Sequence, residues 1–219
     1  SLTAMGPVAI DMYLPSLPAL GAGLHASAGE TQATVSAFLA GMAVGQLFYG
    51  PAADRLGRRP PILLGTAIFV AASIGCALAP SPAMLVGARF VQALGACAGG
   101  VVARAVVRDR FNHTETARML SLLMLIMGLA PILAPLLGGA LLGFGGWRLN
   151  FWFMATFGVA VGLAAFFRLQ ESRSEETTAH AATESPLQAY LALMREPRLV
   201  GYALAGALNG ATLFTYIAS

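Results

Sequence analysis

Two charged side chains lie within long apolar stretches of the sequence, Asp11 in the stretch 2–20 and Arg89 in the stretch 83–104. Burying a charge among apolar residues costs several kcal/mol unless the charge is paired or hydrated, so such a residue usually has a function. If both stretches are helices, a rise of about 1.5 Å per residue puts Asp11 about 14 Å and Arg89 about 9 Å from the ends nearest residues 20 and 83. We therefore predict that the two side chains meet across a central cavity and couple protons or substrate there. A static structural ion pair is the alternative.

Two further features of these stretches concern the same cavity. Gln92 follows Arg89 by three residues, which puts both on one face of a helix, so we expect Gln92 to line the cavity as well. Prolines at positions 7, 15 and 18 flank Asp11, and proline cannot donate the backbone hydrogen bond of a regular helix. We therefore expect a kink in the stretch 2–20 near its charged residue.

The sequence contains no recognisable catalytic or metal-binding pattern. Its histidines, His25, His113 and His180, lie far apart and outside any HExxH or CxxC arrangement, and there is no Walker A sequence. We therefore expect a protein that is not an enzyme and holds no metal. The arginines form short clusters between apolar runs and not one basic face, which argues against nucleic acid as a partner.

The elements that must position these residues follow from the composition. Of the 219 residues, 57% are hydrophobic and only 11% are charged, and the mean hydropathy is +0.72. A soluble domain is about one quarter charged, and a run of about 20 apolar residues is long enough to cross a bilayer as a helix. We therefore predict an all-α membrane protein. The expected spans lie near residues 2–20, 32–53, 60–79, 83–104, 118–142, 149–167 and 198–219.

The arginines predict the orientation of these spans. Eleven of them fall at one side of the bundle, after the second, fourth and sixth spans, namely Arg55, Arg58, Arg59, Arg104, Arg108, Arg110, Arg118, Arg168, Arg173, Arg195 and Arg198. Only Arg148 falls at the other side. Because cytoplasmic segments are enriched in basic residues, we expect the arginine-rich side to face the cytoplasm.

A strongly charged segment divides the chain. We expect an N-terminal bundle of six spans over 1–167, a cytoplasmic linker over 168–197, and a seventh span over 198–219. The linker is either mobile or a surface helix. This organisation is typical of one half of a larger membrane protein together with the start of its second half, so we expect the chain to be a fragment.

The segment between the second and third spans carries the most specific motif. It reads Gly50-Pro51-Ala52-Ala53-Asp54-Arg55-Leu56-Gly57-Arg58-Arg59. This segment resembles the signature G-x-x-x-D-R-x-G-R-R of the major facilitator superfamily and agrees with it at every fixed position. An ordinary basic loop that sets topology would explain the arginines but not Gly50, Asp54 and Gly57. The resemblance implies the N-terminal six-helix half of a major facilitator fold, which works by alternating access.

Other segments resemble the drug:proton antiporters of this superfamily, in particular the Bcr/CflA-like branch. The segment 11–15 is similar to that branch's first-span element, and the segment 89–95 to the fourth-span motif of the family. The following residues also fit, and they supply Asp109 as a candidate partner for Asp54 and Arg58. In the fifth span, a motif typical of antiporters has prolines that would bend the helix and small residues that would let it pack closely. Its residues are Gly128, Pro131, Pro135, Gly138 and Gly139.

The resemblance implies a secondary active multidrug efflux transporter that exports small amphipathic compounds in exchange for protons. Asp11, Tyr13, Arg89 and Gln92 would then line the cavity, and the residues Gly50, Asp54, Arg55, Gly57, Arg58, Arg59 and Asp109 would form the cytoplasmic gate. It implies no cofactor besides the proton gradient. The implied partners are a drug-like molecule, protons and the lipid bilayer of a bacterial inner membrane, and the full-length protein would act as a monomer. The alternatives are a proton-coupled uptake symporter of the same superfamily and, from another class, a seven-span receptor or binding protein.

Overall fold

The computed structural model describes residues 2–172, 190 and 192–218, and every regular element in these ranges is a helix. Within these described ranges, five helices are long and apolar enough to cross a membrane. They are α3 (Ala28–Leu56), α4 (Arg59–Ala77), α5 (Pro82–Arg110), α6 (His113–Gly145) and α7 (Trp147–Arg168). The predicted all-α membrane protein is thereby confirmed.

The first expected span is present as a broken helix. It consists of the short elements η1 (Leu2–Ala4), α1 (Met5–Asp11), η2 (Leu14–Ser16) and α2 (Leu17–Leu24). The predicted kink therefore lies directly after Asp11, where prolines remove backbone donors. We call the turn and 3-10 segment 12–16 the span-1 break.

The long helices extend beyond the predicted apolar runs because polar residues at their ends continue or cap them. Ser27 with Glu30 forms a capping box at the start of α3, and Asn112 with Glu115 forms one at the start of α6. Helix α5 continues through its arginines to Arg110. Arg108, expected to follow the fourth span, therefore belongs to the last turn of α5.

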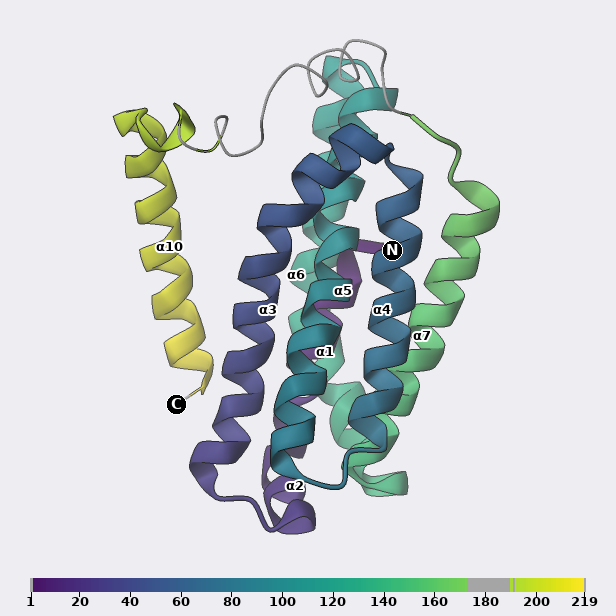
Figure 1. Cartoon of the computed structure of the whole chain (residues 1–219), viewed down its shortest axis with the longest axis vertical. Helices are drawn as coiled ribbons and strands as arrows, with labels where there is room; N and C mark the ends of the chain where they lie inside the picture. Colours follow the sequence, from purple (N-terminus) through teal and green to yellow (C-terminus); the bar gives the residue numbers. More distant parts are fainter. Residues whose placement is uncertain (1, 173–189, 191, 219) are drawn as a thin grey trace. The chain divides into compact units, whose positions relative to one another are not determined.

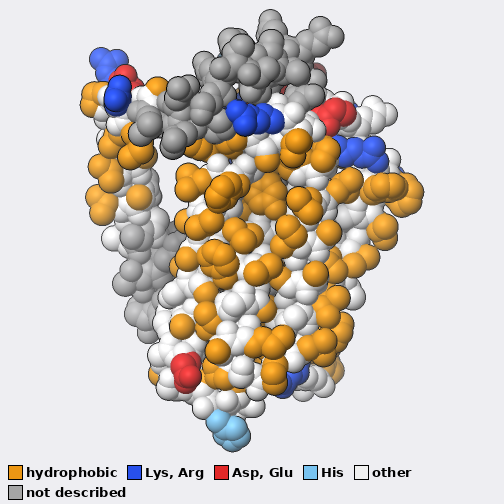
Figure 2. Space-filling model, in the orientation of Figure 1, with side chains coloured by type: hydrophobic (Ala, Val, Ile, Leu, Met, Phe, Trp, Pro, Cys, Tyr) orange, Lys and Arg blue, Asp and Glu red, His pale blue; other side chains and the backbone are white. Residues whose placement is uncertain are grey.

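The residues Ser1–Glu175 form one compact unit, which we call the N-terminal unit. Within it α3 and α4 both pack along α5, α7 packs against α4, and α1 lies between α5 and α6 (Figure 1). The buried core joins the first span to α3, α4 and α7 through large apolar side chains, among them Met5, Phe38, Phe69, Phe151 and Met154. Hydrophobic side chains also cover the middle of the outer face, while charged side chains gather at the ends (Figure 2). This distribution is the one expected where lipid surrounds the bundle.

The residues Glu176–Ser219 form a second unit. Its long helix is α10 (Pro197–Ala218), at the place of the seventh expected span. Most of the expected linker, 168–197, lies outside the described residues, so its character and the division of the chain into 1–167, 168–197 and 198–219 stay predictions.

Candidate functional site

Arg89 is fully buried in the middle of the N-terminal unit. Its Nη1 donates to the backbone carbonyl of Ala9 at 3.0 Å and to Oε1 of Gln92 at 2.7 Å. The guanidinium carbon lies 4.4 Å from the ring centre of Tyr13 and 4.3 Å from that of Phe38. The aromatic rings therefore stabilise this cation by cation–π contact. Gln92 lies beside Arg89, and its place in a central cavity stays a prediction.

Asp11 and Arg89 form no ion pair in the part of the chain that the structure describes. The predicted meeting of these two side chains is therefore not found. The guanidinium of Arg89 is held by the carbonyl oxygen of Ala9 and by the ring of Tyr13, which flank Asp11 in the sequence, and not by the Asp11 carboxylate. Asp11 is 8% exposed at the end of α1, and its carboxylate has no hydrogen-bond partner among the described residues.

A chain of buried polar contacts continues from Arg89 across the unit. Nε2 of Gln92 donates to Oγ of Ser73 at 2.7 Å, and Ser73 donates in turn to the carbonyl of Phe69. The hydroxyl of Tyr13 lies 2.7 Å from Oγ1 of Thr34. These contacts connect the first span to α3, α4 and α5. Among the described residues, Nε and Nη2 of Arg89 are buried without a hydrogen-bond partner, so the network holds this cation through Nη1 and the aromatic rings.

The sequence analysis missed Asn150, which is fully buried in the first turn of α7. Its Nδ2 lies 2.6 Å from Oγ of Ser16 and 3.3 Å from the carbonyl oxygens of Met12 and Gly138. A single amide thus bridges the span-1 break, α6 and α7. The only signal in the sequence is an isolated polar residue at the edge of an apolar run.

The gate motif forms a cluster of charges at the end of the unit where α3 meets α4. Arg58 pairs through Nη1 with Asp54, and its Nε and Nη2 lie 2.7 and 3.4 Å from the two carboxylate oxygens of Asp109. Burial alone would lower the pKa of Arg58, but its hydrogen bonds to Asp109 and Asp54 raise it by a larger amount. The net shift of this pKa is therefore upward. Arg58 therefore stays charged at any physiological pH. Asp109, which the sequence analysis offered as a partner, is brought to Arg58.

Glu171, just beyond α7, also reaches this cluster and was missed by the sequence analysis. Its carboxylate accepts the backbone N–H of Arg58 at 2.8 Å and that of Arg59 at 3.2 Å, so it caps the start of α4. An anion is favourable there because the first N–H groups of a helix lack partners. Gly57 has a φ of 95°, and a Cβ at this position would collide with the Glu171 carboxylate. The backbone conformation thus favours glycine here, and any larger residue would also displace the Glu171 carboxylate from the start of α4.

The remaining gate residues surround these contacts. Gly50 and Arg55 lie in the last two turns of α3. Arg59 donates through Nη2 to the carbonyl of Phe166 at 2.8 Å and lies over the Phe166 ring. Arg59 therefore connects the start of α4 to the end of α7 through one hydrogen bond and one cation–π contact.

The fifth-span motif lies within α6, which continues unbroken through Pro131 and Pro135. Gly138 packs so closely on the span-1 break that a Cβ would overlap the carbonyl of Met12, whereas a Cβ on Gly128 or Gly139 would meet nothing within 4 Å. One glycine of the motif therefore holds α6 against the first span, and the others face away from the helices of this unit.

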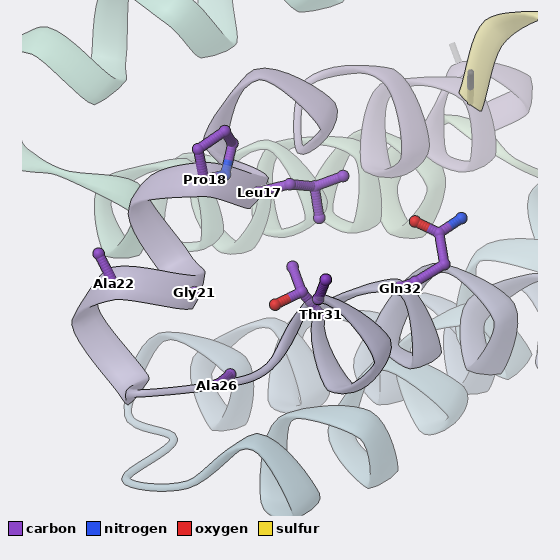
Figure 3. Close-up of a pocket in the computed structure, with 8 residues that line it drawn as sticks. Leu17, Pro18, Gly21, Ala22, Ala26, Thr31 and Gln32 are labelled. Carbon is purple, nitrogen blue, oxygen red and sulfur yellow. The ribbon is translucent and has the colours of Figure 1, made fainter.

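The hollows on the described part of the N-terminal unit include two that adjoin the first span. An apolar groove of about 310 Å³ runs between α1, α6 and α7, with Val8, Met12, Leu133 and Phe157 among its lining residues. A second hollow, of about 380 Å³, lies where Leu17 of α2 stands across from Thr31 and Gln32 of α3 (Figure 3). Its lining residues carry no titratable side chain, so it offers no proton-coupling chemistry.

The arrangement of broken first span, buried cation and charged α3–α4 turn can be compared with known proteins. The sequence model of the Major Facilitator Superfamily matches residues 2–219. The chain belongs to this superfamily. The family is one of transporters and not of enzymes.

Individual relatives agree with this assignment. The chain is 39% identical, over 99% of its length, to a protein of Bacillus subtilis (strain 168) named "Uncharacterized MFS-type transporter YdgK", of which it covers 54%. It is 42% identical, over 85% of its length, to the "Multidrug resistance protein MdtL" of Escherichia coli O6:K15:H31, of which it covers 47%. The chain thus spans about half the length of these curated relatives. In fold it matches the human organic anion transporter MFSD10, with a TM-score of 0.53 at 19% identity over 80% of this chain and 48% of the other.

Proposed function

We propose that the full-length protein to which this chain belongs is a drug:proton antiporter of the Bcr/CflA-like branch. It exports small amphipathic compounds in exchange for protons by alternating access, in the inner membrane of a bacterium and as a monomer. The name of the MdtL relative supports the class of substrate, and the match to the transporter superfamily argues against the seven-span receptor.

The observation that carries the proposal is the position of Asp11. Asp11 is the last residue of α1 and lies directly before the span-1 break. Its carboxyl group is nearly buried and has no basic partner in the described residues. A carboxyl group can exchange a proton where an amide cannot, and a helix break is where transporters place coupling groups. Asp11 thus holds the proton in one state and is free to attract a cationic compound in the other.

Arg89 has a different part in this proposal from the one predicted. Because its guanidinium binds the Ala9 carbonyl and three surrounding rings, it stabilises the end of α1 and does not neutralise Asp11. Tyr13 and Gln92 complete the wall around it. The substrate would then meet a carboxylate that Arg89 does not neutralise.

The cluster around Arg58 is the proposed gate at the cytoplasmic end. Its two aspartates come from α3 and α5, and Glu171 adds the end of α7, so four helices are held together there. A rigid end can move as one body when the cavity opens and closes.

The proposal is tested by replacing Asp11 in the full-length transporter. Asp11→Asn should abolish proton-driven export while the protein still folds and inserts, and Asp11→Glu should retain part of the activity because it keeps a carboxyl group. Glu115→Gln is the matched control, since this acid is exposed at the start of α6. Unchanged export by Asp11→Asn would remove Asp11 from the mechanism. The symporter alternative predicts uptake of substrate together with protons in the same assay.

A further inference from the structure

The span-1 break leaves backbone carbonyl groups without their helical donors. In a regular helix the N–H of Ser16 would bond the carbonyl of Met12, but here it bonds that of Tyr13. Likewise the N–H of Tyr13 bonds Ile10 and not Ala9. Within a membrane each free carbonyl must find another donor inside the protein.

Two side chains supply these donors. Arg89 donates to Ala9, two residues before Asp11, and Asn150 donates to Met12, the residue directly after Asp11. The broken helix is therefore held on both sides of its carboxyl group. The arginine comes from α5 and the amide from α7.

The surroundings of Asn150 define what its amide does. The three atoms around Nδ2 are the carbonyl oxygens of Met12 and Gly138 and the hydroxyl of Ser16, and the carbonyls can only accept. The amide must therefore present its N–H groups to them. Because α6 touches the same Met12 carbonyl at Gly138, the amide also fixes α6 against the break.

We infer that Asn150 is a positioning residue for Asp11, because its amide clamps the span-1 break to α6 and α7. The inference rests on the proposed role of Asp11 in proton coupling. A hydrogen bond that holds the Met12 carbonyl also fixes the backbone directly after Asp11. It therefore determines which groups surround the Asp11 carboxyl group. Loss of the clamp should change how Asp11 exchanges its proton and leave the rest of the unit in place.

The first test uses Asn150→Asp in the full-length protein, a change that preserves the shape of the side chain. A carboxyl group can donate a hydrogen bond to the Met12 carbonyl only while it is protonated. Export relative to wild type should therefore be retained at low pH and fall about tenfold at high pH, the effect of losing one buried hydrogen bond. Asn150→Leu, which cannot donate at any pH, should show the loss throughout the range. Export by Asn150→Leu equal to that of the wild type at every pH would overturn the clamp.

The second test follows Asp11 without measuring transport. A hydrophobic carbodiimide modifies protonated carboxyl groups, and mass spectrometry of the labelled peptide reports the pH dependence of labelling at Asp11. Asn150→Leu should shift that profile. Thr66→Val is the matched control, because Thr66 is also buried but donates only to Ile62 of its own helix. An identical profile in wild type and Asn150→Leu would refute the inference.

The two tests also separate this inference from the proposed function. If Asp11→Asn leaves export unchanged while Asn150→Leu shifts the labelling of Asp11, the coupling role fails but the clamp stands. If Asp11→Asn abolishes export and the labelling does not shift, the coupling role stands and the clamp fails.

Discussion

The sharpest prediction for the gate concerns the unequal aspartates around Arg58. The side chain of Asp109 is 12% exposed and that of Asp54 is 46% exposed, while Arg58 between them is 5% exposed. Water therefore screens the contact with Asp54 far more than the contact with Asp109. We expect Asp109→Asn to damage the gate more than Asp54→Asn, although Asp54 belongs to the signature motif.

The magnitudes follow from this difference in exposure. Asp109 accepts two hydrogen bonds from a buried cation, and losing such charge-assisted contacts costs about 1.5–3 kcal/mol. The contact of Arg58 with Asp54 is open to water on the side of the half-exposed aspartate, so we assign it the value of a screened pair, about 0.2–1 kcal/mol. If the cluster forms in one of the two states of alternating access, Asp109→Asn shifts their ratio at least about tenfold and Asp54→Asn at most about fivefold.

The assay measures the reactivity of a cysteine placed at Arg104, with a membrane-impermeant thiol reagent added from the cytoplasmic side. The buried Cys76 and Cys97 are replaced in the background. We expect labelling to rise and export to fall in Asp109→Asn, with smaller changes in Asp54→Asn. Equal labelling in the two variants, or a larger effect of Asp54→Asn, would refute the reasoning from exposure.

Three further substitutions test other contacts of the unit. Arg89→Lys keeps the charge but loses the planar group that stacks on the aromatic rings, so export should fall about tenfold or more in a transport assay. Glu171→Gln should lower the thermal midpoint of the purified protein, since a weaker cap at the start of α4 costs about 0.5–1 kcal/mol. Gly138→Ala should cost about 1–3 kcal/mol through overpacking, whereas Gly139→Ala, whose Cβ meets open space, should leave the thermal midpoint of the protein unchanged. Equal midpoints in these two alanine variants would contradict the close packing of α6 on the first span.

Much of the fold could be predicted from the sequence because lipid constrains it strongly. Apolar runs of membrane length became the helices α3 to α7, and prolines around Asp11 correctly indicated an interrupted first span. Asp54 and Arg58 are only four residues apart, so their contact across the turn between α3 and α4 is also local in the chain. Patterns of this kind are local in the chain, so they can be read without coordinates.

The contacts of the site were harder to predict because they depend on the direction of side chains around each helix. Depth along the membrane suggested that Asp11 and Arg89 meet, but depth does not say which way either one points. The carbonyl groups freed by the span-1 break also leave no mark in the sequence. Asn150 and Glu171 contact residues that lie 138 and 113 positions away in the sequence, so no local pattern predicts these contacts.

The most direct test of proton antiport at Asp11 is the direction of proton movement driven by substrate. Full-length protein is reconstituted in proteoliposomes that hold a pH indicator, and a cationic drug is added outside without an imposed pH gradient. We predict that drug entering the vesicles drives protons out, raising the internal pH, and that Asp11→Asn abolishes this change while drug binding persists. Acidification of the interior as drug enters, or an unchanged signal in Asp11→Asn, would contradict the account.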